Sequence, residues 1–271
     1  MHRHASITIE SVEERLSTWL AENADASMAR RAEALPLRRD MVALLTFVRD
    51  NKVVGTQATG NMPLKAVREV TALFVNPPKL EDTIGDHTYQ IRSETDVWLL
   101  YFLHILADVG GLLKGGRVRR WRITAQGERF LDVEPRLQVA FLLTVWWYRV
   151  NWIVAYPYEG MGHGLPPLFT RATLASLQQL PAETYVPFDE FADQLIARTG
   201  LRWGARDSPY ATMSLRGSIR AMIIDRLADF GVLERKYRKE AIGKTTIPKL
   251  VEFKITPWGM ALLDALYAMG K

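Results

Sequence analysis

Cysteine is absent from this chain of 271 residues, and no long uninterrupted hydrophobic run is present either. The lack of thiols excludes a disulfide framework, a cysteine nucleophile and a zinc site with thiolate ligands, and it fits a reducing compartment. The first residues are polar and lack the apolar core of a signal peptide. We therefore expect a cytoplasmic protein.

The two most hydrophobic segments, residues 97–109 and 139–155, fall short of a membrane span. The first is too short and contains His104, and the second is interrupted by Arg149 and Asn151. Because a spanning helix needs about 20 mostly apolar residues, both segments are predicted to be buried helices. We expect no membrane partner.

Residue patterns that carry chemistry are scarce. The five histidines have no metal-ligand spacing, no serine lies in a nucleophile elbow, and no pair of carboxylates stands out. Gly243-Lys244-Thr245 matches the end of a phosphate-binding loop, but that motif requires glycine at the position of Arg238. We therefore expect no metal, no cofactor and no catalytic residue, and we predict that the protein is not an enzyme.

What the sequence does contain is a pattern that occurs twice. Leu-Ala-Asp, one further residue and a glycine end at Gly110 and again at Gly231, and a basic stretch then leads to Thr124 and Thr256. The two glycines are predicted to end a helix in the left-handed conformation. The two threonines are predicted to cap the helix that follows.

The basic stretch between glycine and threonine is predicted to be a β-hairpin. In the first copy, Gly115-Gly116 signals a two-residue turn. The returning strand alternates, with Trp121 and Ile123 on one face and Arg120 and Arg122 on the other. Helix, basic hairpin and capped helix, in that order, make up the second half of a winged helix.

The predicted fold class is mainly α with small β-hairpins (α+β), arranged as tandem winged-helix-like units joined by apolar helices. The predicted boundaries are residues 1–35 for an N-terminal helical extension, 36–133 and 182–271 for the two units, and 134–181 for linking helices and a glycine- and aromatic-rich loop. Outside the repeat, the predicted elements are helices at 37–50, 64–74, 138–156, 170–180 and 188–199, a short strand at 53–56, and a first helix beginning at Ser11, which has capping-box spacing to Glu14.

The first unit resembles a known family. The residues that carry the likeness are Leu44-Leu45, Val53-Val54-Gly55-Thr56, Gly60-Asn61, Leu64-Lys65, Val67-Arg68 and Trp121-Arg122-Ile123-Thr124-Ala125-Gln126-Gly127. Over residues 37–131 the chain is similar to helicase-associated winged-helix domains, which accompany the motor of some DNA-repair helicases. The resemblance implies a nucleic-acid setting, although this chain encodes no motor.

Positive charge gathers in the two hairpins. Residues 111–123 contain five basic side chains and no acidic one, and residues 232–255 contain seven basic and three acidic ones, so the remainder of a chain of net charge +5 is negative. Basic wings often lie along phosphates; alternatively, exposed hairpins carry charge to discourage edge pairing. The predicted nucleic-acid-binding residues are Lys114, Arg117, Arg119, Arg120, Arg122, Arg216, Arg220, Arg235, Lys236, Arg238, Lys239 and Lys244.

The helices that precede the two hairpins differ in charge. Residues 93–113 contain no basic side chain, which does not suit the major groove of DNA. The corresponding helix of the second unit places Arg216 and Arg220 one turn apart. We therefore expect the second unit to contact DNA, with these two arginines at base edges, and the first unit to pack or to contact a protein.

Aromatic residues cluster between Trp146 and Tyr158 and lead into a glycine-rich loop. Exposed aromatic rings can stack on single-stranded bases, but such aromatic residues more often form a core between domains, and that core is the prediction here. The loop leaves open a ligand or partner site at Tyr156, Tyr158 and His163.

The sequence thus predicts a non-enzymatic DNA-binding protein that contacts phosphates through its basic wings. The alternative is a protein-interaction scaffold in which the first unit binds a protein partner. A third alternative is an enzyme or ligand binder with its site at residues 156–164.

Overall fold

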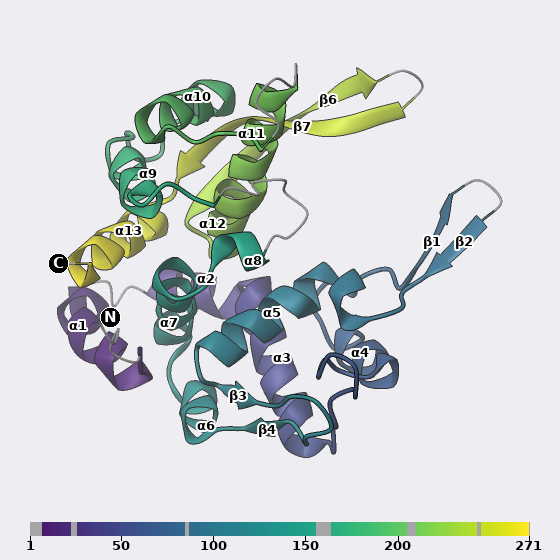
Figure 1. The fold of residues 1–271 in the computed structure, drawn as a ribbon. Helices are drawn as coiled ribbons and strands as arrows, with labels where there is room; N and C mark the ends of the chain where they lie inside the picture. Colours follow the sequence, from purple (N-terminus) through teal and green to yellow (C-terminus); the bar gives the residue numbers. More distant parts are fainter. Residues whose placement is uncertain are drawn as a thin grey trace. The chain divides into compact units, whose positions relative to one another are not determined.

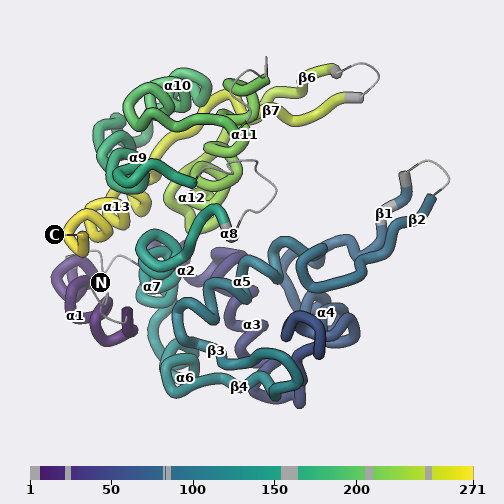
Figure 2. The backbone as a smooth tube through the Cα atoms, in the orientation of Figure 1, coloured from purple at the N-terminus to yellow at the C-terminus, as the bar shows by residue number. Residues whose placement is uncertain are grey.

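The structure, a computed structural model, describes residues 7–22, 26–84, 87–155, 164–204, 210–242 and 245–270. It is mainly helical with small antiparallel sheets, as the sequence predicts (Figure 1). The chain divides into two compact units, Met1–Val150 and Asn151–Lys271, and the path of the backbone within each can be followed in Figure 2. No helix in the described ranges is long and apolar enough to cross a membrane.

The first unit is built around α3 (Pro36–Asp50) and α5 (Trp98–Val109), which pack against each other. Proline suits the first position of α3, and Leu37, Met41 and Leu44 recur at the spacing that buries one helix face. The other elements of this unit are α1 (Ile9–Glu22), α2 (Ala26–Ala34), α4 (Leu64–Thr71), β1 (Glu81–Ile84), β2 (His87–Gln90), η1 (Glu94–Asp96), β3 (Leu113–Lys114), β4 (Arg122–Ile123), α6 (Ala125–Asp132) and α7 (Pro135–Tyr148).

The first helix, α1, begins at Ile9 and not at Ser11, so that prediction is wrong. Ser11 lies in the first turn of α1 and bonds to Thr8, the residue that precedes the helix. Its amide donates to Oγ1 of Thr8 over 3.1 Å, and the Thr8 amide donates to Oγ of Ser11 over 3.0 Å. The two hydroxyls satisfy each other's backbone donors, as in a capping box, and Glu14 is not needed.

The hairpin formed by β1 and β2 is an element that the sequence analysis did not predict. It extends away from the helices of its unit in Figure 1, and every side chain of β2 is exposed. Because both faces of β2 are exposed, no alternation of apolar and polar residues marks this strand in the sequence.

The second unit has a three-stranded antiparallel sheet in the order β5-β7-β6, packed against helices. A helical rod precedes the hairpin: α11 (Ala211–Ile219), a π-helical turn η2 (Arg220–Ile224) and α12 (Asp225–Asp229). The predicted helix at 188–199 is confirmed as α10. The remaining elements are α8 (Trp152–Ala155), α9 (Phe169–Gln178), β5 (Val186–Pro187), α10 (Phe188–Thr199), β6 (Leu233–Ile242), β7 (Thr245–Ile255) and α13 (Pro257–Met269).

The single helix predicted at 138–156 is two helices. The first, α7, ends at Tyr148, and α8 begins at Trp152, where Oδ1 of Asn151 accepts the amide of Ile153 over 3.1 Å and starts the new helix. The division between the two units falls at Val150, inside the segment 134–181 that the sequence predicts as a linker. The four-part domain division stays a prediction.

Tryptophans of the aromatic cluster belong to the cores of the two units. Trp146 and Trp147 are buried within α7, and Trp152 is buried in the second unit, where its ring meets that of Phe169 edge to face at 6.3 Å. The prediction is confirmed as far as the burial of these three side chains, and their placement between domains stays a prediction.

The two copies of the sequence pattern close their hairpins with matching hydrogen bonds. The amides of Thr124 and Thr256 donate to the carbonyls of Leu112 and Val232, each over 3.0 Å. The threonine hydroxyls cap α6 and α13 as predicted, accepting the amides of Gly127 over 3.0 Å and of Gly259 over 2.8 Å.

At the end of the helix that precedes each hairpin, the two glycines that share a conformation are not the two that the sequence pattern aligns. The residue in the left-handed conformation is Gly111 in the first copy (φ 67°) and Gly231 in the second (φ 73°), whereas Gly110 is right-handed (φ −76°). The prediction is therefore confirmed for Gly231 and wrong for Gly110. When Gly111 and Gly231 are aligned, the two Leu-Ala-Asp triplets are offset by one residue. The backbone requires glycine at the position with positive φ, whereas it does not require the triplet at a fixed distance before it.

The predicted two-residue turn at Gly115-Gly116 is also wrong. Strands β3 and β4 pair only at Leu113↔Ile123 and Lys114↔Arg122, which leaves residues 115–121 between them. This segment bonds to the chain at residues 53–55 instead, through bridges between Val54 and Arg120 and between Gly55 and Arg117. The hairpin is short because a third, distant segment takes up its backbone groups.

Candidate nucleic-acid interface

The basic loop, residues 114–122, runs from the end of β3 to the start of β4. Its five cationic side chains are all exposed, while Trp121 is buried, so the predicted alternation of the returning strand is confirmed for Trp121, Arg120 and Arg122. Within the part of the chain that the structure describes, none of the five forms an ion pair. The five are Lys114, Arg117, Arg119, Arg120 and Arg122.

Backbone hydrogen bonds hold the basic loop against residues 53–55. The Gly55 amide donates to the carbonyl of Arg119 over 3.0 Å, and the Gly55 carbonyl accepts the Val118 amide over 3.1 Å. The Trp121 amide donates to the carbonyl of Val53 over 2.9 Å. The arginines of the basic loop therefore lie on backbone that is hydrogen-bonded along one side to the extended residues 53–55.

Two glycines allow this close contact. A Cβ atom on Gly55 would lie 2.1 Å from the carbonyl oxygen of Gly116, and a Cβ atom on Gly60 would lie 2.8 Å from the amide nitrogen of Arg117. Gly60 also has a φ of +86°, a conformation that glycine adopts readily and other residues rarely. The turn at residues 56–60 thus packs directly on the backbone of the basic loop.

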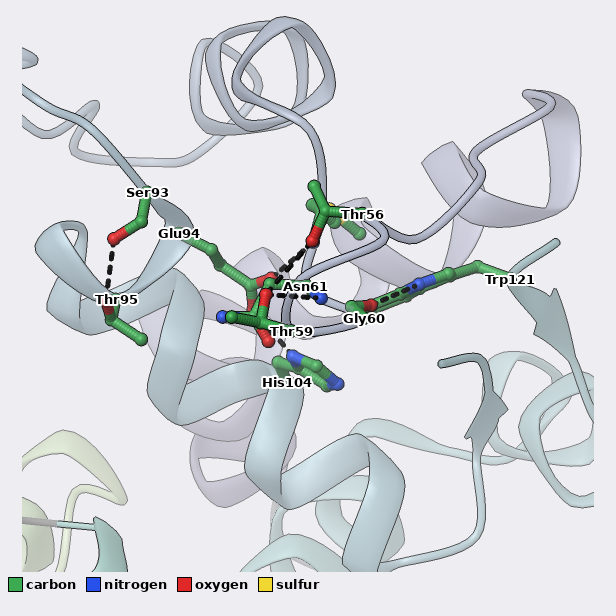
Figure 3. A network of polar contacts seen from close by, with 10 residues as sticks. Thr56, Thr59, Gly60, Asn61, Ser93, Glu94, Thr95, His104 and Trp121 are labelled. Carbon is green, nitrogen blue, oxygen red and sulfur yellow. Dashed lines mark hydrogen bonds and ion pairs between the residues drawn. The ribbon is translucent and has the colours of Figure 1, made fainter. Parts of the chain in front are cut away.

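Trp121 links the basic loop to the turn at residues 56–60 and to α5 (Figure 3). Its indole Nε1 donates to the carbonyl of Gly60 over 3.2 Å, and its ring lies 4.3 Å from that of His104 on α5. A buried tryptophan with its N–H bonded is a rigid support. It joins the turn, the loop and α5 into one body.

Glu94 completes this support (Figure 3). Its side chain is fully buried; Oε2 accepts the amide of Met62 over 2.7 Å, and Oε1 lies 2.6 Å from Nδ1 of His104. Sequence analysis missed this pair because Glu94 lies in Ser-Glu-Thr-Asp, which reads as an ordinary polar helix start. A buried carboxylate is tolerated here because hydrogen bonds satisfy both of its oxygens.

The second hairpin is basic in sequence, but most of its charge is paired. Three ion pairs link β6 and β7: Lys236 with Glu252 at 3.1 Å, Lys254 with Glu234 at 3.0 Å, and Lys249 with Glu240 at 3.5 Å. Arg235 lies 2.5 Å from Asp225 of α12. Of the predicted residues here, Arg238 and Lys239 are exposed without an ion pair in the described region, and Lys244 lies outside the described residues.

The two arginines predicted to read bases are likewise engaged within the protein. Arg216 forms a two-point contact with Asp193, at 2.9 and 2.5 Å, and lies 3.1 Å from Asp189; hydrogen bonding to Asp193 raises the pKa of its guanidinium. Nε of Arg220 lies 3.5 Å from Asp225. Either side chain would have to give up an aspartate before it could contact a base.

Two large hydrophobic side chains at α11 are exposed. Met213 is 66% exposed, and Tyr210, just before the helix, is 63% exposed. Gly217 is exposed as well, and a Cβ atom on it would meet nothing within 4 Å.

Tyr156, Tyr158 and His163 lie outside the described residues. In the ranges that the structure covers, no group of three or more histidine and acidic side chains is arranged to hold a metal ion.

Comparison with known proteins gives no relative. No protein-family model matches the chain, and searches of curated proteins and of solved structures find no match either.

Proposed function

We propose that this chain is a non-enzymatic DNA-binding protein of two winged-helix units, and that the basic loop of the first unit is its main contact. The resemblance of residues 37–131 to helicase-associated winged-helix domains agrees with this proposal. So does the fact that, within the described ranges, none of the loop's five cations forms an ion pair with an acidic side chain.

The order of elements supports winged-helix units. The first unit has the helix α3, the extended residues 53–55, the helices α4 and α5, the strands β3 and β4, and the helix α6. The second has a similar order with α9, β5, α10, α11, β6, β7 and α13, although the first unit also has β1, β2 and η1 between α4 and α5, and the second has η2 and α12 before β6. In both, the first extended segment pairs with the returning arm of the hairpin, through Val54 and Arg120 in one unit and Val186 and Phe253 in the other.

The observation that carries the proposal is the set of cations that stand on fixed backbone and form no ion pair in the part of the chain that the structure describes. Each phosphate that a cation neutralises releases a counterion, so binding gains free energy that depends on salt. Cations already paired with carboxylates, such as Lys236 and Arg216, contribute less because the carboxylate must be displaced. This favours the first unit for DNA, the reverse of the expectation from sequence.

A charge-matched comparison tests the proposal. We would measure the affinity for a fluorescent duplex from about 50 to 300 mM salt. The variant Arg117→Gln, Arg119→Gln, Arg120→Gln removes three unpaired cations, and the control Lys236→Gln, Lys249→Gln, Lys254→Gln removes three paired ones.

We expect the arginine variant to lose about tenfold or more in affinity and about 2.7 from the slope of log K against log salt, at about 0.9 for each lost phosphate contact. The control should stay close to the unaltered protein. Equal losses in both variants would mean that only overall charge matters, and no binding at about 50 mM salt would end the DNA hypothesis.

A protein contact is a second candidate, and the observation that favours it is the exposed Met213 and Tyr210 on the second unit. Aromatic residues and methionine are enriched at protein interfaces. A Met213→Asp variant tests whether the exposed side of α11 contacts a protein or DNA. Unchanged DNA affinity is expected if α11 contacts protein, and a loss of about tenfold would place it on DNA instead.

A further inference from the structure

Val118, at the tip of the basic loop, has an unusual backbone conformation. Its φ is +55°, a region that β-branched residues rarely occupy. The Arg119 amide donates to the carbonyl of Gly116 over 3.1 Å, so Val118 is the third residue of a four-residue turn. Positive φ at that position is normally supplied by glycine or asparagine.

Packing does not explain why valine stands there. The side chain is 66% exposed, so it contributes little to a core. The backbone needs only an amide to reach the Gly55 carbonyl at 3.1 Å, which any residue except proline provides. A costly conformation that gains the fold nothing points to a use of the side chain outside the fold.

The residues around Val118 limit the kinds of ligand that its side chain could contact. Arg117 and Arg119 flank it, both exposed and without an ion pair in the described region, so an apolar tip stands between two free positive charges. The loop's aromatic residue, Trp121, is buried and cannot stack on single-stranded bases. One valine is also too small an apolar surface to hold a membrane, which requires a larger buried area or two anchoring signals.

We propose that Val118 is a wedge that enters the minor groove of duplex DNA and partly unstacks one base step, while Arg117 and Arg119 hold the phosphates on either side. This rests on the proposed DNA-binding function and adds that the ligand is a duplex and that binding bends it. Aliphatic side chains inserted in this way kink DNA by about 20–90°. The rigid contact with Gly55 and Gly60 prevents the tip from folding back when it meets the stacked bases.

Energy transfer between dyes on the two ends of a duplex of about 30 base pairs, stiff on that scale, tests the wedge. Val118→Gly and Val118→Asn each remove the apolar tip and suit positive φ. Both should therefore keep or raise the unfolding temperature, which excludes misfolding as a cause. Val118→Ile keeps a branched aliphatic tip.

We expect the unaltered protein and Val118→Ile to bend the duplex, and the glycine and asparagine variants to bind it straight. Their affinity should fall by about tenfold or less, and the salt slope should not change because the phosphate contacts remain. Bending that survives in both variants, or binding without any bend, overturns the wedge and leaves DNA binding intact. No duplex binding at about 50 mM salt overturns both. Binding of phosphatidylserine vesicles that is lost in Val118→Gly would assign the tip to a membrane surface instead.

Discussion

Gly127 and Gly259 stand at the same position in the two units: a Cβ atom on Gly127 would lie 2.3 Å from the carbonyl oxygen of Leu112, and one on Gly259 would lie 2.0 Å from that of Val232. Cβ atoms essentially never come within 3.0 Å of such atoms. Each capped helix therefore begins against the backbone of its own hairpin at a distance that only glycine allows. The repeated glycine in the sequence has a steric cause.

Gly127→Ala and Gly259→Ala should each lower the free energy of unfolding by about 1–3 kcal/mol, because the added methyl group overpacks against backbone. Urea denaturation measures the change. Gly217→Ala is the control, since its Cβ meets nothing within 4 Å, and it should stabilise α11 by up to about 1 kcal/mol. Wild-type stability in Gly127→Ala would contradict the close approach.

Thr124→Ala and Thr256→Ala should each cost about 1–2 kcal/mol, since each removes a helix cap. The same hydroxyls also donate to the carbonyls of Gly111 and Gly231, over 2.6 and 2.9 Å. Serine keeps both hydrogen bonds, so the Thr→Ser variants should recover most of the loss in thermal unfolding. If serine and alanine behave alike, the hydroxyl is not the stabilising group.

Asp40 should make stability depend on pH. It is buried in α3, and its Oδ1 accepts the Val75 amide over 2.7 Å. Burial raises the pKa of Asp40 above its ordinary value of 3.8, and the Val75 hydrogen bond and the charge of Arg39 oppose the rise only in part. The folded state then holds this proton more tightly, so its contribution to stability is full below 3.8 and is lost as pH rises through the folded pKa.

Asparagine does not titrate, so the variant Asp40→Asn should not lose stability as pH rises. Its free energy of unfolding, compared with that of the unaltered protein, should therefore increase between pH 3.8 and the folded pKa of Asp40 and then stay constant. Urea midpoints measured from pH 3 to 7, about the range over which carboxylates titrate, give the curve. Asp40→Ala leaves the Val75 amide unpaired and should cost about 1–3 kcal/mol at every pH. Parallel curves for Asp40→Asn and the unaltered protein would show that burial does not shift this group.

Arg216→Gln should leave DNA affinity within about twofold, because the guanidinium is already held by Asp189 and Asp193. The loss of stability should be at most about 1 kcal/mol, since the aspartate side chains are 44% and 47% exposed and solvent weakens the ion pairs. Anisotropy titration and urea denaturation measure the two effects. An affinity loss of about tenfold would mean that Arg216 exchanges its aspartates for DNA.

Gly60→Ala should weaken DNA binding without any change of charge. Its methyl group would displace the backbone at Arg117, and alanine does not suit a φ of +86°. We expect an affinity loss of about tenfold at fixed salt. Gly200→Ala is the matched control, with a φ of +66° in the second unit and nothing within 4 Å. Equal affinities in the two variants would show that the position of the basic loop is unimportant.

Several predictions from sequence hold because their causes are local. The threonine caps at Thr124 and Thr256 depend on residues three positions apart, and α10 is marked by its apolar spacing and by acidic residues in its first turn. The burial of Trp121 follows from alternation along a strand. Each of these patterns lies within a few residues of the sequence.

Two of the errors arise from contacts between different segments of the chain. Gly115-Gly116 has the composition of a tight turn, but the backbone there bonds to residues 53–55 and opens into a loop. Charge counting treated Lys236 and Lys114 alike, although the first is paired across the sheet with Glu252 and the second has no ion pair in the described region. Pairing depends on which strands are neighbours, and composition does not contain that information.

By itself, the sequence determined the helix α10, the threonine caps at Thr124 and Thr256 and the concentration of basic residues between glycine and threonine in each copy of the repeat, because helical spacing and capping are short-range properties. Only the tertiary structure decided which cations are free, why Glu94 is buried with His104, and how residues 53–60 hold the basic loop. The hydrogen bonds of Met62 with Glu94 and of Trp121 with Gly60 join residues 32 and 61 positions apart, and they stabilise the fold only after the chain has paid the entropy of closing those loops.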